Sequence, residues 1–508
     1  MNSYLQRAFF FPLVLLFFSL NSTRVAHSTV TEDHLTIVFT SGMAEIHLDA
    51  DQGGHAHLQT LLKNIRQIDE QVIFIHGGDA LSPGILSTVD KGAHMISILN
   101  DLSPDLMAVS KSDLAHQEDA LSLRCFEAAF PIVCSNIFDP LTEGPLEGLL
   151  TNFIQNVGNL KVGFISVIDP EVIADYMPQR ITTTDLNRAV IENSKLLRQQ
   201  GADLVILVAG FNIESFNSYL SSPPVDVVLL SETSANIGLT QQGNSLFELK
   251  GHKGIASIIT LKITKNDAGT QWTGDGKTVL LNNYAPDPIV EEKIDAYLIQ
   301  LSVLLDKVIG MTRTNLDTRR ESIRKGENAL ANLTADAIRM YYQSDVALIN
   351  AGGFRGNRQY PSGSNLTVGD IQKELPFNNR VINLKLSGKL LQHAIEKGLS
   401  RIEEMKGCFP HISGIIVKYD PQKPPLQRIV SITINGEPLD LFKTYNLTTT
   451  DYLANGGDGY TDLTGAERIV KVGETRLLWE YVRDYIAEKA AISPKIDGRM
   501  TAVTHNKL

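Results

Sequence analysis

Cysteine and tryptophan are scarce in this 508-residue chain, which has three of the first and two of the second. The cysteines are Cys125, Cys134 and Cys408, so a scaffold framed by disulfides is excluded and at most one intrachain bridge can form. Cys125 and Cys134 are the only near pair, and two buried free thiols explain them equally well. With 43% hydrophobic residues, a chain of this length can bury two cores, one in a longer and one in a shorter domain.

Long basic runs and long apolar runs are also missing from most of the chain. The net charge of -11 makes nucleic-acid polymers and anionic membranes poor partners. One apolar run, Ala8–Leu20, is too short to span a bilayer comfortably and is followed by the small residues Ala26 and Ser28. Residues 1–28 therefore read as a cleaved secretory signal, and the polar end at residues 505–508 lacks a lipid-anchor signal. We expect a secreted or periplasmic protein without a membrane partner.

Apolar β-rich runs alternate with amphipathic stretches through the first half, which is the rhythm of an α/β fold. The expected strands are Leu35–Thr40, Val72–Ile75, Leu106–Val109, Ile132–Ser135, Val162–Val167, Leu204–Val208 and Val225–Leu230. A later β-rich run, Leu246–Ile263, favours two packed sheets with helices outside. We expect the polar segment Lys265–Lys277 to be a loop that ends this domain, and Pro288–Ile309 to be a helix that links it to the next.

Three segments in the C-terminal half are candidates for a ligand pocket. They are Asn350–Arg355 (NAGGFR), Leu375–Asn379 (LPFNN) and Asp451–Tyr460 (DYLANGGDGY), each of which the pattern places just after a strand. The paired glycines in the first and third segments allow unusual backbone dihedral angles or a close approach to a ligand. The three segments are therefore predicted to be loops that form one site.

Four side chains in these loops have chemistry suited to a nucleotide or nucleoside. Arg355 presents a planar fork of donors for phosphate or carboxylate. Phe377 and Tyr452 offer two flat faces for a base, at roughly 1–3 kcal/mol per stack. Asp458 can accept hydrogen bonds from ribose hydroxyls or base amines. Phe377 could instead be a core residue, and Asp458 could instead cap a turn. The occurrence of all four side chains together favours a binding site.

The order and spacing of these segments, preceded by Arg320, Arg324 and the helical run Glu327–Ile338, resemble the C-terminal domain of the secreted 5'-nucleotidase family. The resemblance implies that the arginines grip phosphate, that Asn350 contacts the base, and that Phe377 and Tyr452 form an aromatic sandwich. Tyrosine at 452 stands where the family usually has phenylalanine. The substrate-binding set predicted in this way is Arg320, Arg324, Asn350, Arg355, Phe377, Asn379, Tyr452 and Asp458.

The same resemblance covers the N-terminal half, where it implies a metallophosphatase domain. Two-metal phosphoester hydrolysis needs a dense set of His, Asp and Asn ligands around an attacking water. Of the seven ligand positions that the resemblance implies, Asp79 alone keeps its ligand. The other six hold Gly42, Ala44, Lys111, Gly210, Glu232 and Ser234, and Ser112 and Ala115 replace the catalytic His–Asp pair. These changes favour a phosphatase centre without catalytic residues.

A relocated metal site is the alternative. The run His47–His57 is rich in His and Asp, and His76 lies three residues before Asp79. This run is also typical of a solvated loop that leads into a helix with an apolar face at Leu58–Ile65. Lys111 has two explanations as well, because its ammonium could replace the charge of a lost metal or could lie at the surface.

Three functions stay open from the sequence. The first is a member of the 5'-nucleotidase family that binds a nucleotide or nucleoside, has no cofactor and has lost catalysis. The second is an active hydrolase that uses Zn, Mn, Co or Mg on relocated ligands, and the third is an interaction protein with a vestigial pocket. The fold expected for all three is α/β: a four-layer sandwich of two sheets with helices outside, followed by an α/β substrate-binding domain. The expected boundaries are 1–28 (signal), 29–285 (metallophosphatase-like domain), 286–310 (linker helix) and 311–508 (C-terminal domain).

Overall fold

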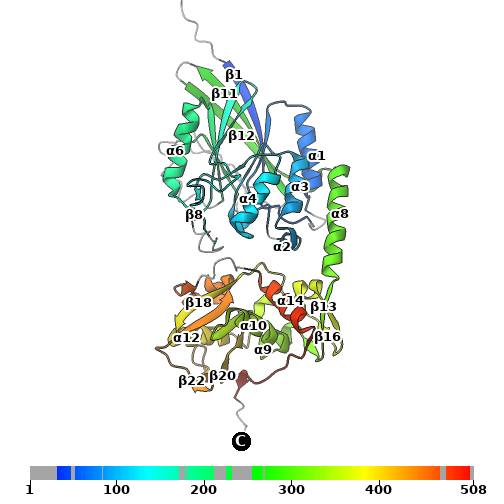
Figure 1. Cartoon of the computed structure of the whole chain (residues 1–508), viewed down its shortest axis with the longest axis vertical. Helices are drawn as coiled ribbons and strands as arrows, with labels where there is room; N and C mark the ends of the chain where they lie inside the picture. Colours follow the sequence, from blue (N-terminus) through cyan, green and yellow to red (C-terminus); the bar gives the residue numbers. More distant parts are fainter. Residues whose placement is uncertain are drawn as a thin grey trace, which may run out of the picture.

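A computed structural model of the chain describes residues 31–46, 52–82, 84–170, 178, 180–210, 225–231, 254–266, 269–469 and 476–503. The predicted signal at residues 1–28 lies outside them, as do Glu232, Ser234 and the stretch 47–51. The chain forms two lobes that are connected by the long helix α8 (Pro288–Leu305) (Figure 1).

Two sheets form the centre of the N-terminal lobe. The larger sheet has the strand order β12 (Gly269–Leu280), β11 (Ile255–Asn266), β1 (Thr31–Thr40), β2 (Val72–His76), β3 (Leu106–Ala108) and β4 (Ile132–Val133). The smaller sheet has the order β10 (Val227–Leu230), β9 (Leu204–Ala209), β7 (Leu160–Val167) and β6 (Phe153–Val157). Strands β1 to β4 run parallel, so the loops that follow them emerge at one edge of the sheet.

The two sheets pack face to face, and helices cover their outer faces. Phe39 and Leu261 of the larger sheet meet Phe164 and Ile206 of the smaller sheet in a buried core. Helices α1 (His55–Arg66), α3 (Ala93–Leu102) and α4 (Gln117–Glu127) cover the larger sheet, and α6 (Leu186–Gln199) covers the smaller one. The expected four-layer arrangement is confirmed. It forms because each sheet has apolar side chains on both faces, one packed against the other sheet and one against helices.

The polar segment Lys265–Lys277 is not the loop that its composition suggests. Most of it forms the edge strand β12, which pairs with β11 in a hairpin from Ile255 opposite Leu280 to Asn266 opposite Gly269. An edge strand with one solvated face has polar residues at alternate positions, which hides it from a search for apolar runs. Trp272 on this strand packs against the core between the sheets.

Helix α8 is shorter than the sequence pattern indicates. The Asp287 carboxylate caps it by accepting hydrogen bonds from the N–H groups of Ile289 (3.2 Å) and Val290 (3.4 Å). The helix ends at Leu305, and residues Val308–Thr312 form strand β13, which pairs with β17 (Asn365–Thr367) and β25 (Ala491–Ile492). Pairing partners that are distant in sequence decided this boundary.

The C-terminal lobe is built on a mixed five-stranded sheet. Its strand order is β19 (Pro410–Ser413), β15 (Val346–Asn350), β23 (Thr444–Thr450), β18 (Val381–Ser387) and β24 (Glu467–Ile469). A second sheet has the order β22 (Glu437–Pro438), β21 (Ile429–Ile434), β20 (Ile415–Tyr419) and β26 (Met500–Ala502). The helices are α9 (Arg320–Lys325), α10 (Ala329–Tyr342), α11 (Val368–Glu374), α12 (Gly388–Leu399), α13 (Asp451–Ala454) and α14 (Leu478–Lys489).

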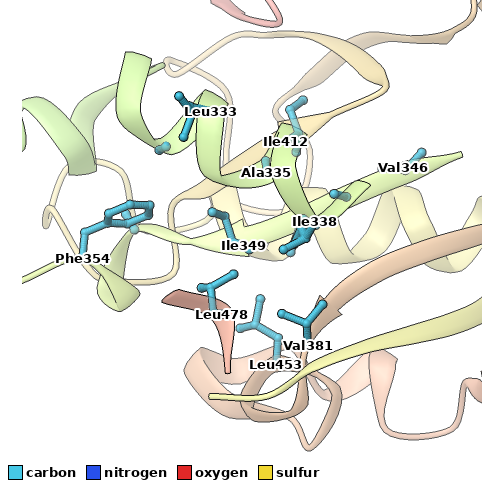
Figure 2. Packing of buried hydrophobic residues seen from close by; sticks show 14 of the residues in the cluster. Leu333, Ala335, Ile338, Val346, Ile349, Phe354, Val381, Ile412, Leu453 and Leu478 are labelled. Atoms are coloured by element: carbon cyan, nitrogen blue, oxygen red, sulfur yellow. The ribbon is translucent and has the colours of Figure 1, made fainter. Parts of the chain in front are cut away.

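Helix α10 anchors the core of this lobe. Its residues Leu333, Ala335 and Ile338 lie over Ile349 of β15 in the buried cluster shown in Figure 2. Asn328 caps the helix by accepting hydrogen bonds from Leu330 N–H (3.0 Å) and Ala331 N–H (3.3 Å). This packing fixes β15, and with it the loop that begins at Asn350.

Two further observations bear on the sequence expectations. Cys125, Cys134 and Cys408 are all free thiols. Among the described residues, the structure contains no helix with the length and apolar character needed to cross a bilayer.

Candidate nucleotide site and the neighbouring phosphatase centre

Parallel pairing brings two of the three predicted loops together. Strands β15 and β23 are parallel neighbours, so the loops after Asn350 and Thr450 emerge at the same edge of the sheet. The third loop, Leu375–Asn379, follows helix α11 and not a strand, which corrects the expectation from sequence. It reaches the site because it leads into β18, which pairs with β23.

A cavity of about 350 Å³ lies where these loops meet. It is lined by Arg324, Asn350, Gly352, Gly353, Arg355, Phe377, Asn379, Gly407, Tyr452 and Asp458. The fold thus brings together seven of the eight predicted binding residues; the eighth, Arg320, lies exposed on the first turn of α9. The sequence analysis did not predict Gly407 as a lining residue, because nothing in the sequence around a single glycine indicates contact with a distant loop. The binding role of the set stays a prediction.

Asp458 is held in place by hydrogen bonds on both carboxylate oxygens. Asn350 Nδ2 donates to Oδ2 at 2.7 Å, and Tyr452 Oη donates to Oδ1 at 3.2 Å. The Asp458 N–H also donates to Tyr452 Oη at 3.1 Å. Asp458 has a left-handed φ of 50°, between Gly456 and Gly459, which also have positive φ. Each of its oxygens keeps a further lone pair for a ligand hydroxyl.

Two glycines allow the backbone beneath Asp458 to pack closely. A Cβ on Gly352 would lie 3.0 Å from Asp458 Oδ2 and 3.1 Å from the Cα of Gly407. A Cβ on Gly407 would meet the same carboxylate oxygen at 3.0 Å. The Gly352 N–H donates to the carbonyl of Gly407 at 2.8 Å, so the two segments form a continuous floor. The paired glycine at 352 therefore serves close packing.

The two aromatic rings remain accessible from the cavity. Phe377 is 41% exposed and Tyr452 is 42% exposed, which is unusual for side chains of this size. Phe377 is therefore not a buried core residue, which was the alternative interpretation of its position beside Pro376. The guanidinium carbon of Arg355 lies 5.0 Å from the centre of the Phe377 ring, a cation–π contact that positions the arginine at the cavity.

Positive charge is concentrated at one side of the cavity. Arg324 is buried, and its Nη1 donates to the Met405 carbonyl at 3.2 Å. Burial, followed by the positive charges of Arg320 and Arg355, lowers the pKa of Arg324. The positive charges of Arg320 and Arg355 therefore act on Arg324, although Arg320 does not line the cavity.

In the N-terminal lobe, the loops after the parallel strands also converge, but they carry mainly serine and glycine. Ser41 Oγ donates to the Ser231 carbonyl at 3.3 Å, which joins the loops after β1 and β10. A Cβ on Gly210 would lie 2.9 Å from Ser110 Oγ. Ser112 donates to Asp79 Oδ1 from its N–H (2.8 Å) and from its hydroxyl (2.6 Å).

Asp113 fastens two of these loops together. Its Oδ1 accepts hydrogen bonds from the N–H groups of Ala80 and Leu81, both at 2.9 Å. Its Oδ2 accepts from Asp79 N–H (2.8 Å) and Ser110 N–H (2.9 Å). Burial and the charge of Asp79 raise the pKa of Asp113 to about 7, and the N–H donors oppose that rise. Asp113 therefore has a structural function that its position in the sequence did not reveal.

Comparison with known proteins extends over both lobes. Residues 308–465 match the family described as "5'-nucleotidase, C-terminal domain". The chain is 26% identical to mouse 5'-nucleotidase, covering 89% of this chain and 86% of that protein. It is also 26% identical to the snake venom 5'-nucleotidase of Naja atra, covering 88% of this chain and 92% of that protein. The C-terminal lobe thus matches the 5'-nucleotidase C-terminal domain, and the chain is similar to 5'-nucleotidases over most of its length.

Solved structures show the same two-lobed fold. The NAD nucleotidase of Haemophilus influenzae matches with a TM-score of 0.69 at 16% identity, over 93% of this chain and 100% of that one. A 5'-nucleotidase precursor from Thermus thermophilus matches with a TM-score of 0.57 at 22% identity, over the same shares. The expectation of a metallophosphatase-like lobe followed by a 5'-nucleotidase C-terminal lobe is confirmed for the fold.

Five of the seven ligand positions that the resemblance implies are described, and their side chains do not supply the donors for two metal ions. At these five positions Asp79 supplies the single carboxylate, and Ser112 already donates to it twice. Gly42, Ala44 and Gly210 offer no side-chain ligand, and Lys111 is an exposed cation. Within the described ranges, no group of three His, Cys, Asp or Glu side chains could hold a metal. Two of the positions, Glu232 and Ser234, lie outside those ranges.

Two histidines of the alternative site accept backbone hydrogen bonds, whereas neither ring nitrogen of His55 has a hydrogen-bond partner among the described residues. His57 Nδ1 accepts the Gly54 N–H at 3.1 Å at the start of α1, and His76 Nδ1 accepts the Gly78 N–H at 3.2 Å. Burial, followed by the charge of His94, lowers the pKa of His55 to about 4. Burial, followed by the charge of His55, lowers the pKa of His76 to about 3. His47, Asp49 and Asp51 lie outside the described residues.

Proposed function

We propose that this protein binds a nucleotide or nucleoside in the cavity of its C-terminal lobe and does not hydrolyse it. The observation that carries the proposal is that two accessible aromatic rings, an anchored carboxylate and two arginines, Arg324 and Arg355, line one cavity. A base stacks between Phe377 and Tyr452, and ribose hydroxyls donate to Asp458. The phosphate is met by Arg324 and Arg355, with Arg320 contributing its charge.

The side chains at the former metal centre support the loss of catalysis. Attack on a phosphoester by a metal-bound water needs two cations, each held by several N and O ligands. A centre with Asp79, Ser110 and Ser112 supplies too few of them. We also propose that the protein acts outside the cytoplasm after cleavage of the signal at residues 1–28.

The test is calorimetric titration of the mature protein with adenosine, AMP, UMP and a sugar phosphate. Adenosine and AMP are expected to bind, and Phe377→Ala and Tyr452→Ala are each expected to weaken both by about 1–3 kcal/mol through lost stacking. Arg355→Ala is expected to weaken AMP more than adenosine, because its guanidinium addresses the phosphate.

Leu426→Ala is the matched control, since it also truncates an exposed apolar side chain but lies outside the cavity. It is expected to leave both affinities unchanged. Absence of binding by every probe at millimolar concentration would contradict the proposal and favour an interaction protein with a vestigial pocket.

A further inference from the structure

A buried carboxyl group lies close to the nucleotide cavity without lining it. Glu374 ends helix α11, is 1% exposed and does not belong to the cavity wall. Its Oε1 accepts hydrogen bonds from two buried hydroxyl groups, Tyr360 Oη at 2.8 Å and Thr318 Oγ1 at 2.9 Å. Burial raises the pKa of Glu374, and the two hydroxyl groups and the charge of Arg358 oppose that rise. Since a buried carboxyl group costs free energy, packing alone does not explain a glutamate at this position.

Thr318 connects Glu374 to the segment that follows Arg355. The Thr318 Oγ1 accepts the Arg358 N–H at 3.1 Å, and the Thr318 N–H donates to the Arg358 carbonyl at 2.9 Å. Helix α9, which carries Arg324, begins just after Thr318. The two segments that contribute arginines to the cavity are therefore joined to each other beside the Glu374 carboxyl group.

The main chain of residue 374 holds Arg355 directly. The Arg355 N–H donates to the Glu374 carbonyl at 2.9 Å, and the guanidinium carbon of Arg355 lies 5.0 Å from the centre of the Phe377 ring. The next residue, Gly356, packs so closely that a Cβ at this position would overlap the Glu374 carboxyl group. The segment that carries Arg355 therefore contacts both the main chain and the side chain of residue 374.

We propose that Glu374 is a positioning residue that fixes the distance between Arg355 and the ring of Phe377 in the nucleotide cavity. Its carboxyl group lies between Gly356 and Thr318, and its main chain leads directly into the segment that carries Phe377. Groups that are held in place before the ligand binds lose less entropy on binding. A nucleoside monophosphate uses both the ring and the arginine, so it depends on this distance more than a nucleoside does. The inference rests on the nucleotide site proposed above.

The experiment is calorimetric titration of the full mature chain with AMP and with adenosine. Glu374→Leu is close in size and cannot accept a hydrogen bond, so we expect it to weaken AMP about tenfold and adenosine less. Glu374→Gln keeps an acceptor oxygen for the two hydroxyl groups and is expected to retain most of the AMP affinity. Equal AMP affinities of the Leu and Gln variants would overturn the proposal.

Tyr360→Phe removes one of the two hydroxyl donors and keeps the ring, so it is expected to fold. It should weaken AMP about threefold, since one hydrogen bond that holds Glu374 is lost. Tyr445→Phe is the matched control, because Tyr445 is also buried and its Oη forms a hydrogen bond outside the cavity, accepted from the Asp440 N–H at 3.2 Å. The control should leave the AMP affinity unchanged. Equal affinities of the two phenylalanine variants would contradict the role of Glu374.

A double-mutant cycle separates positioning from a general loosening of the lobe. In the Arg355→Ala protein, Glu374→Leu is expected to weaken AMP less than it does in the wild-type chain, because the two residues act on the same contact. An identical loss in the two backgrounds would show that Glu374 does not act through Arg355, and the proposal would be wrong.

Hydrogen exchange in the ligand-free chain tests the proposal without a nucleotide. The Arg355 N–H is expected to exchange about tenfold faster in Glu374→Leu than in the wild-type chain, and at an unchanged rate in Tyr445→Phe. Absence of AMP binding by the wild-type chain would contradict the function proposed above, whereas faster exchange would still support the positioning role of Glu374. An unchanged exchange rate in the Glu374→Leu protein would overturn that role.

Discussion

Tyr452 shows how one added atom changes the role of a side chain. The resemblance to the family predicted a stacking ring here, and the structure adds a hydroxyl that contacts both the carboxylate and the N–H of Asp458. In the proposed binding mode, the hydroxyl would hold Asp458 ready to accept from a ribose, which would reduce the entropy lost on binding. Sequence comparison could supply the ring, but only the fold placed the hydroxyl against residue 458.

We expect Tyr452→Phe to weaken adenosine binding by about 1 kcal/mol, the net value of a typical hydrogen bond. Binding of 2',3'-dideoxyadenosine is expected to change little, because that ligand lacks the hydroxyls that Asp458 accepts. The measurement is titration calorimetry with both ligands. An equal loss for the two ligands would show that the hydroxyl does not act through the ribose, and no loss for either would show that residue 452 acts through its ring alone.

A buried histidine makes the stability of the C-terminal lobe depend on pH. His411 is 1% exposed, and its Nε2 is hydrogen-bonded to the Ile323 carbonyl at 2.9 Å. Burial lowers the pKa of His411 from 6.5 to about 4. Between these values the unfolded chain holds more protons than the folded one, so the stability present above pH 6.5 is lost as the pH falls toward 4.

We expect this histidine to contribute a slope of up to about 1.4 kcal/mol per pH unit between pH 6.5 and 4. His411→Gln keeps a side-chain N–H for Ile323 and removes the titrating group, so the slope should decrease by that amount. The measurement is urea denaturation of the whole chain at several pH values. Parallel slopes for the two proteins would contradict the assignment.

At the scale of elements, Asp113 connects the loops after β2 and β3. Four backbone N–H groups converge on its two oxygens. Asp113→Asn leaves a single acceptor oxygen and should cost about 2–4 kcal/mol in the free energy of unfolding, because hydrogen bonds to charged groups are strong.

The loss is to be measured by denaturation at pH 8, above the pKa of about 7, where the carboxyl is ionised. Asp203→Asn is the comparison, since that carboxylate accepts one backbone N–H, from Lys161 at 2.8 Å. It should cost less. Equal losses for the two variants would show that Asp113 is not a special connection between the loops.

At the scale of the whole molecule, the resemblance to 5'-nucleotidases has different implications for the two lobes. It implies that the C-terminal lobe keeps the residue types for binding and that the N-terminal lobe keeps the strands without most of the metal ligands. We expect the purified protein to contain well below one equivalent of Zn, Mn or Co, and hydrolysis of AMP to be near background with any divalent ion. Gly42→Asp with Ala44→His should not restore activity, because four other ligand positions and the catalytic pair stay altered.

Elemental analysis and a phosphate-release assay test this expectation. Two metal equivalents, or turnover abolished by Asp79→Ala, would favour the active hydrolase instead. His47, His55, His57 and His76 would then be the residues to substitute.

The sequence by itself determined the α/β layers, the resemblance to 5'-nucleotidases and most of the cavity lining, because apolar periodicity and short loop motifs are local signals. It did not determine that β12 is a strand, that α8 ends at Leu305, or that Leu375–Asn379 follows a helix, since each depends on partners distant in the chain. Only the tertiary structure brought Gly407 beneath Asp458 and gave Asp113 its four donors. Contacts between residues that are far apart in sequence arise from packing of whole elements, and no local pattern records them.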